Sequence, residues 1–229
     1  MKICTFNIQN NYRSYDNSKT KDIYNFLKDN KIDILGLQEV FGKCSDDLDL
    51  LLRSNYHMEG KYRFLSKYLL RRFNEKTPII TKYNIVSFKT FNLPFLPSVL
   101  KRVITHVVVN YKGEEISIYN THLEVKNENV KKRQLNKIYS LLINDSRKKI
   151  LMGDFNLKNN NPLFLNFINS LEDIGMKRIP LNEKTLKKSK YSREIDHIFL
   201  SDEFVIRDKT VIKDLKISDH YPVIVEIEL

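Results

Sequence analysis

The sequence predicts an α/β domain in which helices cover a mixed β-sheet or two packed sheets. Segments with strand periodicity alternate with segments of helix periodicity along the 229-residue chain, which is typical of layered α/β domains. The dipeptide Lys112-Gly113 separates two strand-like segments as a hairpin turn does, so antiparallel strands accompany a parallel unit near the N-terminus. The sequence contains no internal repeat or linker, and we expect one domain over residues 1–229.

The first part of the chain predicts a strand–helix–strand unit followed by a second helix. Polar and apolar residues alternate at the N-terminus as in a half-buried strand, and the next segment has apolar residues at helical spacing. The second strand is apolar nearly throughout, which is typical of a strand buried on both faces. In order, the predicted elements are a strand at Lys2–Ile8, a helix at Asp22–Lys28, a strand at Ile32–Val40 and a helix at Asp46–Ser54.

The remainder of the chain predicts more strands than helices. Apolar residues follow each other at helical spacing in two segments, and the other periodic segments are short and strand-like. The predicted helices are Val130–Ile143 and Pro162–Leu171, and the predicted strands are Thr77–Lys89, Val103–Asn110, Glu115–Thr121, Lys149–Met152, Ile195–Ser201 and Val223–Leu229.

The composition is that of a water-soluble globular protein. Hydrophobic residues make up 41% and charged residues 29% of the chain, and no segment reaches the roughly 20 apolar residues of a membrane-spanning helix. The N-terminal segment lacks the apolar stretch of a secretion signal, and Cys4 and Cys44 are too few for a disulfide framework or a thiolate zinc site. We expect a cytoplasmic monomer with two reduced thiols and no stable membrane insertion.

The chain is strongly basic, with a formal net charge of +11 and a pI near 9.4. Such a surplus attracts polyanions, so nucleic acid or an anionic lipid surface is a suitable partner, although a compositional bias of the source would give the same surplus. Two segments mix basic and aromatic residues, Tyr56–Phe73 and Lys184–Arg193. Each suits phosphate contact and base stacking, and each is equally well explained as a solvated charged face.

Polar side chains recur where the predicted strands end or begin. A buried carboxylate without a partner is costly, so several of them in similar positions are best explained by a shared cation. Oxygen ligands without thiolates favour Mg²⁺, or alternatively Mn²⁺, over zinc. The residues in these positions are Asn7, Glu39, Asn120, His122, Asp154, Asn156, Asp196, His197, Asp219 and His220.

Six short segments containing these residues resemble the endonuclease/exonuclease/phosphatase superfamily, in that superfamily's order and over nearly the whole chain. They are Thr-Phe-Asn-Ile-Gln, Leu-Gln-Glu-Val, Asn-Thr-His-Leu-Glu, Gly-Asp-Phe-Asn, Ile-Asp-His-Ile-Phe-Leu-Ser and Ser-Asp-His-Tyr-Pro-Val. The resemblance implies a four-layer α/β sandwich, with two mixed β-sheets packed face to face, helices outside and the active site at one rim. It also implies a metal-dependent phosphoester hydrolase.

The resemblance further implies a role for each site residue. Glu39 resembles the principal metal ligand, assisted by Asn7 and Asp219. Asp154 resembles the residue that orients and deprotonates the attacking water, and His220 the residue that stabilises the charge on phosphorus with its ring fixed by Asp196. The implied phosphate-binding residues are Asn7, His122, Asn156 and His220.

These roles are chemically reasonable, because attack on a phosphodiester builds up negative charge that a metal and imidazolium or amide donors stabilise. Arg102 and the pair Arg133-Gln134 fall where superfamily members often have similar residues, and we treat them as supporting or structural. We expect His57, His106 and His197 to be structural.

Three functions are compatible with the sequence. The residues of the Gly-Asp-Phe-Asn and Ser-Asp-His-Tyr-Pro-Val segments are similar to those of pancreatic-type deoxyribonuclease. This similarity favours a nuclease or DNA-repair phosphodiesterase. The alternative is a phosphatase or phosphodiesterase acting on phospholipid head groups or small phosphate esters, and an exposed apolar surface at Phe91–Leu100 would favour it. A binding module that lost the reaction is disfavoured, because every motif position that carries chemistry is intact.

Overall fold

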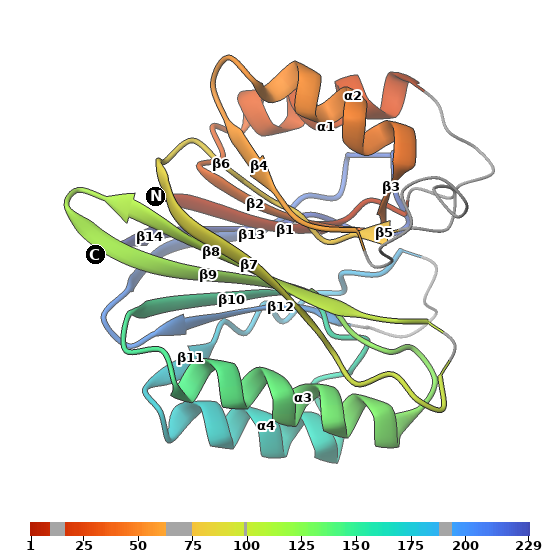
Figure 1. Cartoon of the computed structure of the whole chain (residues 1–229), viewed down its shortest axis with the longest axis vertical. Helices are drawn as coiled ribbons and strands as arrows, with labels where there is room; N and C mark the ends of the chain where they lie inside the picture. Colours follow the sequence, from red (N-terminus) through yellow and green to blue (C-terminus); the bar gives the residue numbers. More distant parts are fainter. Residues whose placement is uncertain (10–16, 63–74, 99, 188–193) are drawn as a thin grey trace.

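The computed structural model describes residues 1–9, 17–62, 75–98, 100–187 and 194–229. Within this part of the chain two six-stranded sheets pack face to face, with two helices outside each sheet (Figure 1). This arrangement confirms the predicted four-layer α/β sandwich. None of the helices in the described segments is long and apolar enough to cross a membrane.

The first sheet has the strand order β13-β14-β1-β2-β6-β4, and helices α1 and α2 lie outside it. Its β1 and β2 pair in parallel, and its other neighbours pair antiparallel. The strand bounds are β13 Val205–Val211, β14 Val223–Glu228, β1 Lys2–Asn7, β2 Ile34–Gln38, β6 Ile79–Thr81 and β4 His57–Glu59, and the helices are α1 Asn17–Asp29 and α2 Gly42–Leu52.

The second sheet has the order β11-β12-β10-β9-β8-β7, with α3 and α4 outside it. Here β9 and β10 form the parallel pair. The bounds are β11 Met176–Arg178, β12 Asp196–Ser201, β10 Lys148–Asp154, β9 Glu114–His122, β8 Val103–Tyr111, β7 Ile85–Asn92, α3 Glu128–Ile143 and α4 Pro162–Glu172, and a separate small sheet pairs β3 Val40–Phe41 with β5 Glu75–Lys76.

Side-chain capping fixes where the two outer helices of the second sheet begin. The side chain of Asn127 accepts a hydrogen bond from the Val130 amide at the start of α3, and Asn161 accepts from the Leu163 amide at the start of α4. Pro162 follows as the first residue of α4, where its missing N–H costs no hydrogen bond. The apolar face of each helix then packs on the sheet.

Three apolar layers hold the four structural layers together. Ile3 and Ile34 of the first sheet meet Val107 and Ile150 of the second in the central layer, and separate clusters lie beneath the helices on each side. Each fully buried Leu, Ile or Phe contributes about 1.5 to 3 kcal/mol of transfer free energy, so this burial is the main stabilising term. The buried pattern of β2 confirms that it is covered on both faces.

The prediction of one strand over Thr77–Lys89 is wrong. The segment contains β6 in the first sheet and β7 in the second, separated by a turn at residues 82–84. The turn is held by the Lys82 amide, which donates to the carbonyl of Asp33, and by the Tyr83 amide, which donates to Oγ1 of Thr81. The apolar pattern is not interrupted between β6 and β7, because both strands face the central core. It therefore cannot show that the chain passes from one sheet to the other.

The sequence also missed β4, β5, β11 and β13, and it started α1 five residues late and α2 four residues late. β4 and β11 have only three residues each, which is too short for a periodic pattern, and all but one residue of β13 are exposed. An exposed edge strand needs no apolar alternation.

The parallel pairs of the two sheets place the polar strand ends at one rim. Because β1 and β2 run in the same direction, Asn7 and Glu39 emerge together, and His122 and Asp154 do so at the ends of β9 and β10. In Figure 1 this rim lies on the right, away from both termini. The packing of β1 against β10 brings the two sets of side chains face to face.

Candidate active site

Asp154 lies at the centre of the rim and is 1% exposed. Its Oδ2 is 3.0 Å from Nδ2 of Asn7, 3.6 Å from Nε2 of His122 and 3.8 Å from Nε2 of His220. Burial raises the pKa of this carboxyl, but the two imidazoles and the hydrogen bonds from Asn7 and the Asn156 amide lower it below its usual value. Asp154 is therefore ionised at neutral pH and can accept a proton from a neighbouring water.

Gly153 allows the close approach of strands that forms this centre. Its φ is 149°, and a Cβ at this position would lie 2.0 Å from the carbonyl oxygen of Thr121 on the adjacent strand. Only glycine fits here. The strands thereby keep the register that sets Asp154 opposite His122 on one side and Asp196 on the other.

His220 forms a buried pair with Asp196. Its Nδ1 donates to Oδ2 of Asp196 at 2.9 Å, which turns Nε2 toward Asp154. Although burial lowers the pKa of His220, the carboxylates of Asp196, Asp154 and Asp219 raise it to about 10. The backbone amide of His220 also donates to Oγ of Ser218, which itself donates to the carbonyl of Asn7, so the ring is tied to the end of β1.

Asn7, Glu39 and Asp219 come together beside this centre. Nδ2 of Asn7 lies 3.3 Å from Oε1 of Glu39, and Gln9 bridges Asn7 and Asp219 through its amide and its side chain. Oδ1 of Asp219 is buried without a hydrogen-bond partner in the described part of the chain. Two carboxylates, one of them with this unsatisfied oxygen, and an amide fit a hard divalent cation.

A second acidic group lies close by. Ligand atoms of Asp154, Asp196 and His220 all lie within 4.8 Å of one another, which is compact enough for a metal ion. However, Nδ1 of His220 is already used in the bond to Asp196, and the raised pKa keeps the ring protonated. A protonated imidazole does not ligate a cation, so this group is better suited to holding a proton than a metal.

Glu75, which sequence reasoning missed, forms a buried triad with Arg102 and His122. Nδ1 of His122 lies 2.7 Å from one carboxylate oxygen of Glu75, and the guanidinium of Arg102 lies 2.9 Å from the other. Each of the three residues is at most 5% exposed. The pairing leaves Nε2 of His122 facing Asp154. Glu75 lies on the short strand β5, and no sequence motif at a strand end pointed to it.

Asn156 has a left-handed backbone, with φ of 51°, two residues after Asp154 at the end of β10. Its amide donates to Oδ1 of Asp154 at 2.9 Å, and its side chain donates to the carbonyl of Leu123 at 3.2 Å. Its carbonyl accepts a hydrogen bond from Nζ of Lys131, which is 6% exposed. The side chain of Asn156 is half-buried at the rim.

Lys131 was also missed, although it lies one helical turn before Gln134 on α3. Gln134 is buried and binds the Glu124 amide and the carbonyl of Pro94, so it shapes the neighbouring loop. Arg133 is exposed and contacts the carbonyl of Leu96. Among Lys131, Arg133 and Gln134, Lys131 is therefore the residue whose side chain contacts a predicted site residue, Asn156.

The remaining histidines lie away from the rim. His197 packs between Phe155 and Phe164 and lies 3.0 Å from the carbonyl of Leu157. His57 is exposed on β4, and His106 lies on the outer face of the second sheet.

The basic and aromatic segments are described only in part. Residues 63–73 of the first segment and 188–193 of the second lie outside the described residues. In the segment Phe91–Leu100, Leu93 is buried, whereas Leu96 is 65% exposed and Leu100 is 48% exposed. Part of its apolar surface is therefore accessible.

Structural comparison places the fold among known phosphoesterases. An endonuclease/exonuclease/phosphatase from Bacteroides vulgatus superposes with a TM-score of 0.84 at 20% identity, covering 100% of this chain and 98% of that one. A mannosyl-6-phosphatase from Bacteroides thetaiotaomicron gives 0.81 at 20% identity with 100% of both chains covered, and the catalytic domain of human Nocturnin, solved with a sulfate anion, gives 0.81 at 17% identity, covering 100% and 94%.

A search of curated proteins found no significant match. The model of the Endonuclease/Exonuclease/phosphatase family matches residues 4–220. This match spans five of the six motifs and the first three residues of the sixth, and it confirms the resemblance seen in the sequence. The chain therefore belongs to the Endonuclease/Exonuclease/phosphatase family, whose members are hydrolases of phosphoester bonds.

Proposed function

We propose that this phosphoesterase is a divalent-metal-dependent phosphodiester hydrolase that acts on nucleic acid, as a nuclease or DNA-repair phosphodiesterase. The observation that carries the proposal is the position of the Asp154 carboxylate, which faces the Asn7 amide and the imidazoles of His122 and His220 at one rim. A proton acceptor and several donors thus converge at this rim, as the attack of water on a phosphate requires.

Each of these groups has a distinct part in hydrolysis. Asp154 orients the attacking water and accepts its proton. His220, protonated through its pair with Asp196, donates from Nε2 to a phosphate oxygen as negative charge develops there. His122, held by Glu75, together with Asn7 and Asn156, binds the other phosphate oxygens.

Glu39, Asn7 and Asp219 would hold a divalent cation, which we propose to be Mg²⁺, or Mn²⁺ in its place. The fit rests on their oxygen donors and on the unsatisfied Oδ1 of Asp219. When bound, such a cation polarises the phosphate and offsets the charge of the leaving oxygen.

Lysines around the rim favour a polyanionic substrate. Lys187 and Lys216 line a cavity of about 370 Å³ next to Asp219, together with Gln9. Nζ of Lys19 lies 3.0 Å from the carbonyl of Gln9. The chain has a net charge of +11, and these cations would attract the nucleic acid backbone toward the catalytic rim.

Two buried free thiols suit the cytoplasm, where we propose that the protein acts.

A phosphatase or phosphodiesterase acting on phospholipid head groups or small phosphate esters is the second candidate. The exposed Leu96 and Leu100, next to Lys101, favour it, because an apolar surface beside a cation suits a lipid interface. The similarity of the fold to a mannosyl-6-phosphatase is compatible with a small phosphate ester.

Hydrolysis of a substrate panel tests the proposal. The panel contains supercoiled plasmid, single-stranded DNA, a 5′-tyrosyl oligonucleotide, sphingomyelin vesicles and inositol phosphates, each with Mg²⁺ or with EDTA. We expect Mg²⁺-dependent cleavage of a nucleic acid that is lost in Asp154→Asn and retained in the surface control Asp202→Asn. Turnover of lipid or small esters alone would select the second candidate, and turnover that persists in EDTA would overturn the metal dependence.

A further inference from the structure

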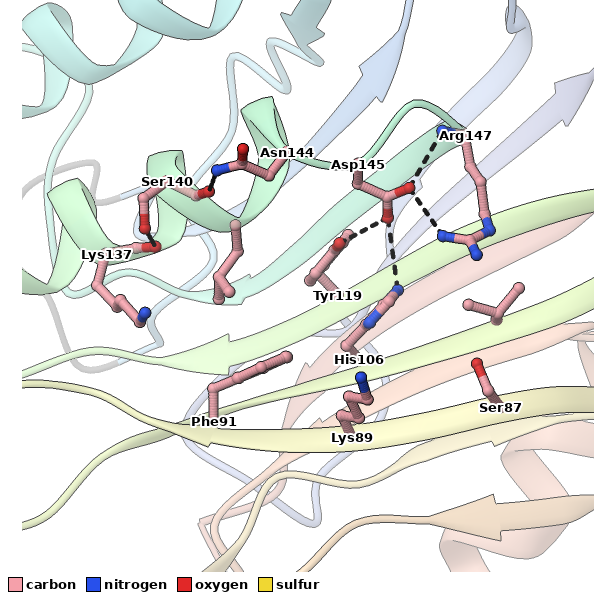
Figure 2. Close-up of a pocket in the computed structure, with 12 residues that line it drawn as sticks. Ser87, Lys89, Phe91, His106, Tyr119, Lys137, Ser140, Asn144, Asp145 and Arg147 are labelled. Atoms are coloured by element: carbon pink, nitrogen blue, oxygen red, sulfur yellow. Dashed lines mark hydrogen bonds and ion pairs between the residues drawn. The ribbon is translucent and has the colours of Figure 1, made fainter.

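A cavity of about 410 Å³ lies on the outer face of the second sheet, away from the catalytic rim. It is bounded by α3 on one side and by the strands β7, β8 and β9 on the other (Figure 2). The lining residues are Ser87, Lys89, Phe91, His106, Val108, Tyr119, Lys137, Ser140, Leu141, Asn144, Asp145 and Arg147, and none of them belongs to the catalytic site.

The base of the cavity is a buried polar network. The hydroxyl of Tyr119 donates to Oδ2 of Asp145 at 2.7 Å, and Nε2 of His106 lies 3.6 Å from the same oxygen. Arg147 donates to Oδ1 of Asp145 at 3.0 Å. The rings of His106 and Tyr119 stack with centroids 4.2 Å apart. Tyr119 and Asp145 are 2% and 8% exposed, so this network is preformed rather than a surface contact.

The charge of the cavity is positive. Lys89 and Lys137 point into it from opposite sides and form no ion pair with a carboxylate in the described part of the chain (Figure 2). Among the described residues that line the cavity, Asp145 is the only acidic one, and it shares Arg147 with Glu115. Burial lowers the pKa of His106 to about 4, so its ring is neutral at pH 7. The two ammonium groups therefore give the cavity a positive lining that suits an anion.

The walls between these cations are apolar. Phe91 and Val108 line the strand side, and Leu141 lines the helix side. The hydroxyl of Ser87 lies at the open edge of the strand side, where it can donate to an oxygen. A cavity with separated cations, a few polar groups and an apolar wall matches the usual construction of a small-molecule site.

We propose that this cavity is a second ligand site, which binds a small phosphate monoester carrying an apolar or aromatic group. The dianionic phosphate lies between Lys89 and Lys137, and the organic part packs against Phe91, Val108 and Leu141. The site is separate from the catalytic rim, and its binding needs no metal.

The test is an NMR titration with AMP and with inorganic phosphate, recorded in EDTA so that hydrolysis is excluded. We expect AMP to shift the backbone amides of residues 87–91 and 137–147 saturably, with an affinity clearly higher than that of phosphate. The double variant Lys89→Gln/Lys137→Gln should weaken AMP binding about a hundredfold, because two charged hydrogen bonds are lost and each contributes about tenfold. The charge-matched control is Lys21→Gln/Lys132→Gln, both on exposed helix positions.

Three results would overturn the proposal. They are shifts confined to the catalytic rim, equal affinity for AMP and phosphate, and equal weakening in the two double variants. Thermal melting of each variant verifies that the fold is kept. Because the residues tested are remote from Asp154, the same variants should retain hydrolysis of the substrate identified by the panel.

Discussion

Nδ1 of His220 lies 2.9 Å from Oδ2 of Asp196, and both side chains are buried at the end of the catalytic rim. The two residues come from different sheets: Asp196 begins β12, and His220 precedes β14. Their bond fixes the ring so that Nε2 faces Asp154. It also keeps the imidazole protonated at neutral pH.

Replacing Asp196 with Asn should therefore impair catalysis more than folding. Asn keeps the shape of the side chain but no longer stabilises an imidazolium, so we expect kcat to fall about 10²- to 10⁴-fold with a small change in KM. Steady-state kinetics on the substrate found in the panel measures this, with circular dichroism to verify the fold. Retention of kcat within about twofold would show that Asp196 does not act through His220.

Removing one member of the Glu75–Arg102 pair should destabilise the protein strongly. Arg102→Met leaves the carboxylate of Glu75 buried and without its 2.9 Å partner, and breaking a buried pair costs about 3 to 5 kcal/mol. The double variant Glu75→Gln/Arg102→Met should lose less than the sum of the two single losses, because no charge is then stranded. Urea unfolding of the four proteins measures the coupling, and additive losses would contradict it.

Asn120 ties the two sheets together beneath the catalytic rim. Its Nδ2 donates to the carbonyls of Leu37 in β2 and of Pro78 just before β6, at 2.8 and 2.9 Å, and its Oδ1 accepts from Gln38 at 2.7 Å. Asn120→Ala leaves these buried groups unsatisfied, so we expect the free energy of unfolding to fall by about 2 to 3 kcal/mol. Urea unfolding checks this against Asn92→Ala, an exposed position that should change little. If Asn120→Ala lost as little stability as Asn92→Ala, the contact between the sheets would not be stabilising.

His106 should make the stability of the protein fall in mild acid. Its pKa is about 4 in the folded state and near its ordinary value of about 6.5 in the unfolded state. The unfolded chain therefore binds the proton first, and the stabilising contribution is complete above pH 6.5 and lost as the pH falls toward 4. With an allowance for solvent screening of this half-buried ring, the loss is on the order of 1 to 2 kcal/mol.

The matched measurement is urea unfolding of wild type and His106→Gln at pH 7.5 and at pH 4.5. The wild type should lose more stability between the two pH values than the variant does. An equal loss in both proteins would assign the acid sensitivity to other groups.

Magnesium should stabilise the protein through Glu39, Asn7 and Asp219. A ligand that binds only the folded state stabilises it by RT ln(1 + L/Kd), where L is the ligand concentration, so the melting temperature rises with that concentration. We expect Mg²⁺ to raise the melting temperature of wild type but not of Glu39→Gln, whereas the exposed control Glu203→Gln should respond as wild type does. Scanning calorimetry with and without EDTA measures both. A response in Glu39→Gln equal to that of wild type would move the cation to another site.

The sequence by itself determined the fold class and most of the rim. Strand-end motifs fix Asn7, His122 and Asp154 locally, because a parallel strand pair sets both of its ends at the same edge. The order of the six motifs then indicates the family, which the match over residues 4–220 confirms.

Only the tertiary structure decided how distant segments meet. Glu75 reaches His122 across 47 residues of sequence, and the segment Thr77–Lys89 divides between two sheets without any break in its apolar pattern. The second cavity likewise forms between α3 and the strands β7, β8 and β9. Local periodicity records which face of an element is buried, but the partner that buries it is chosen by packing between elements far apart in the chain.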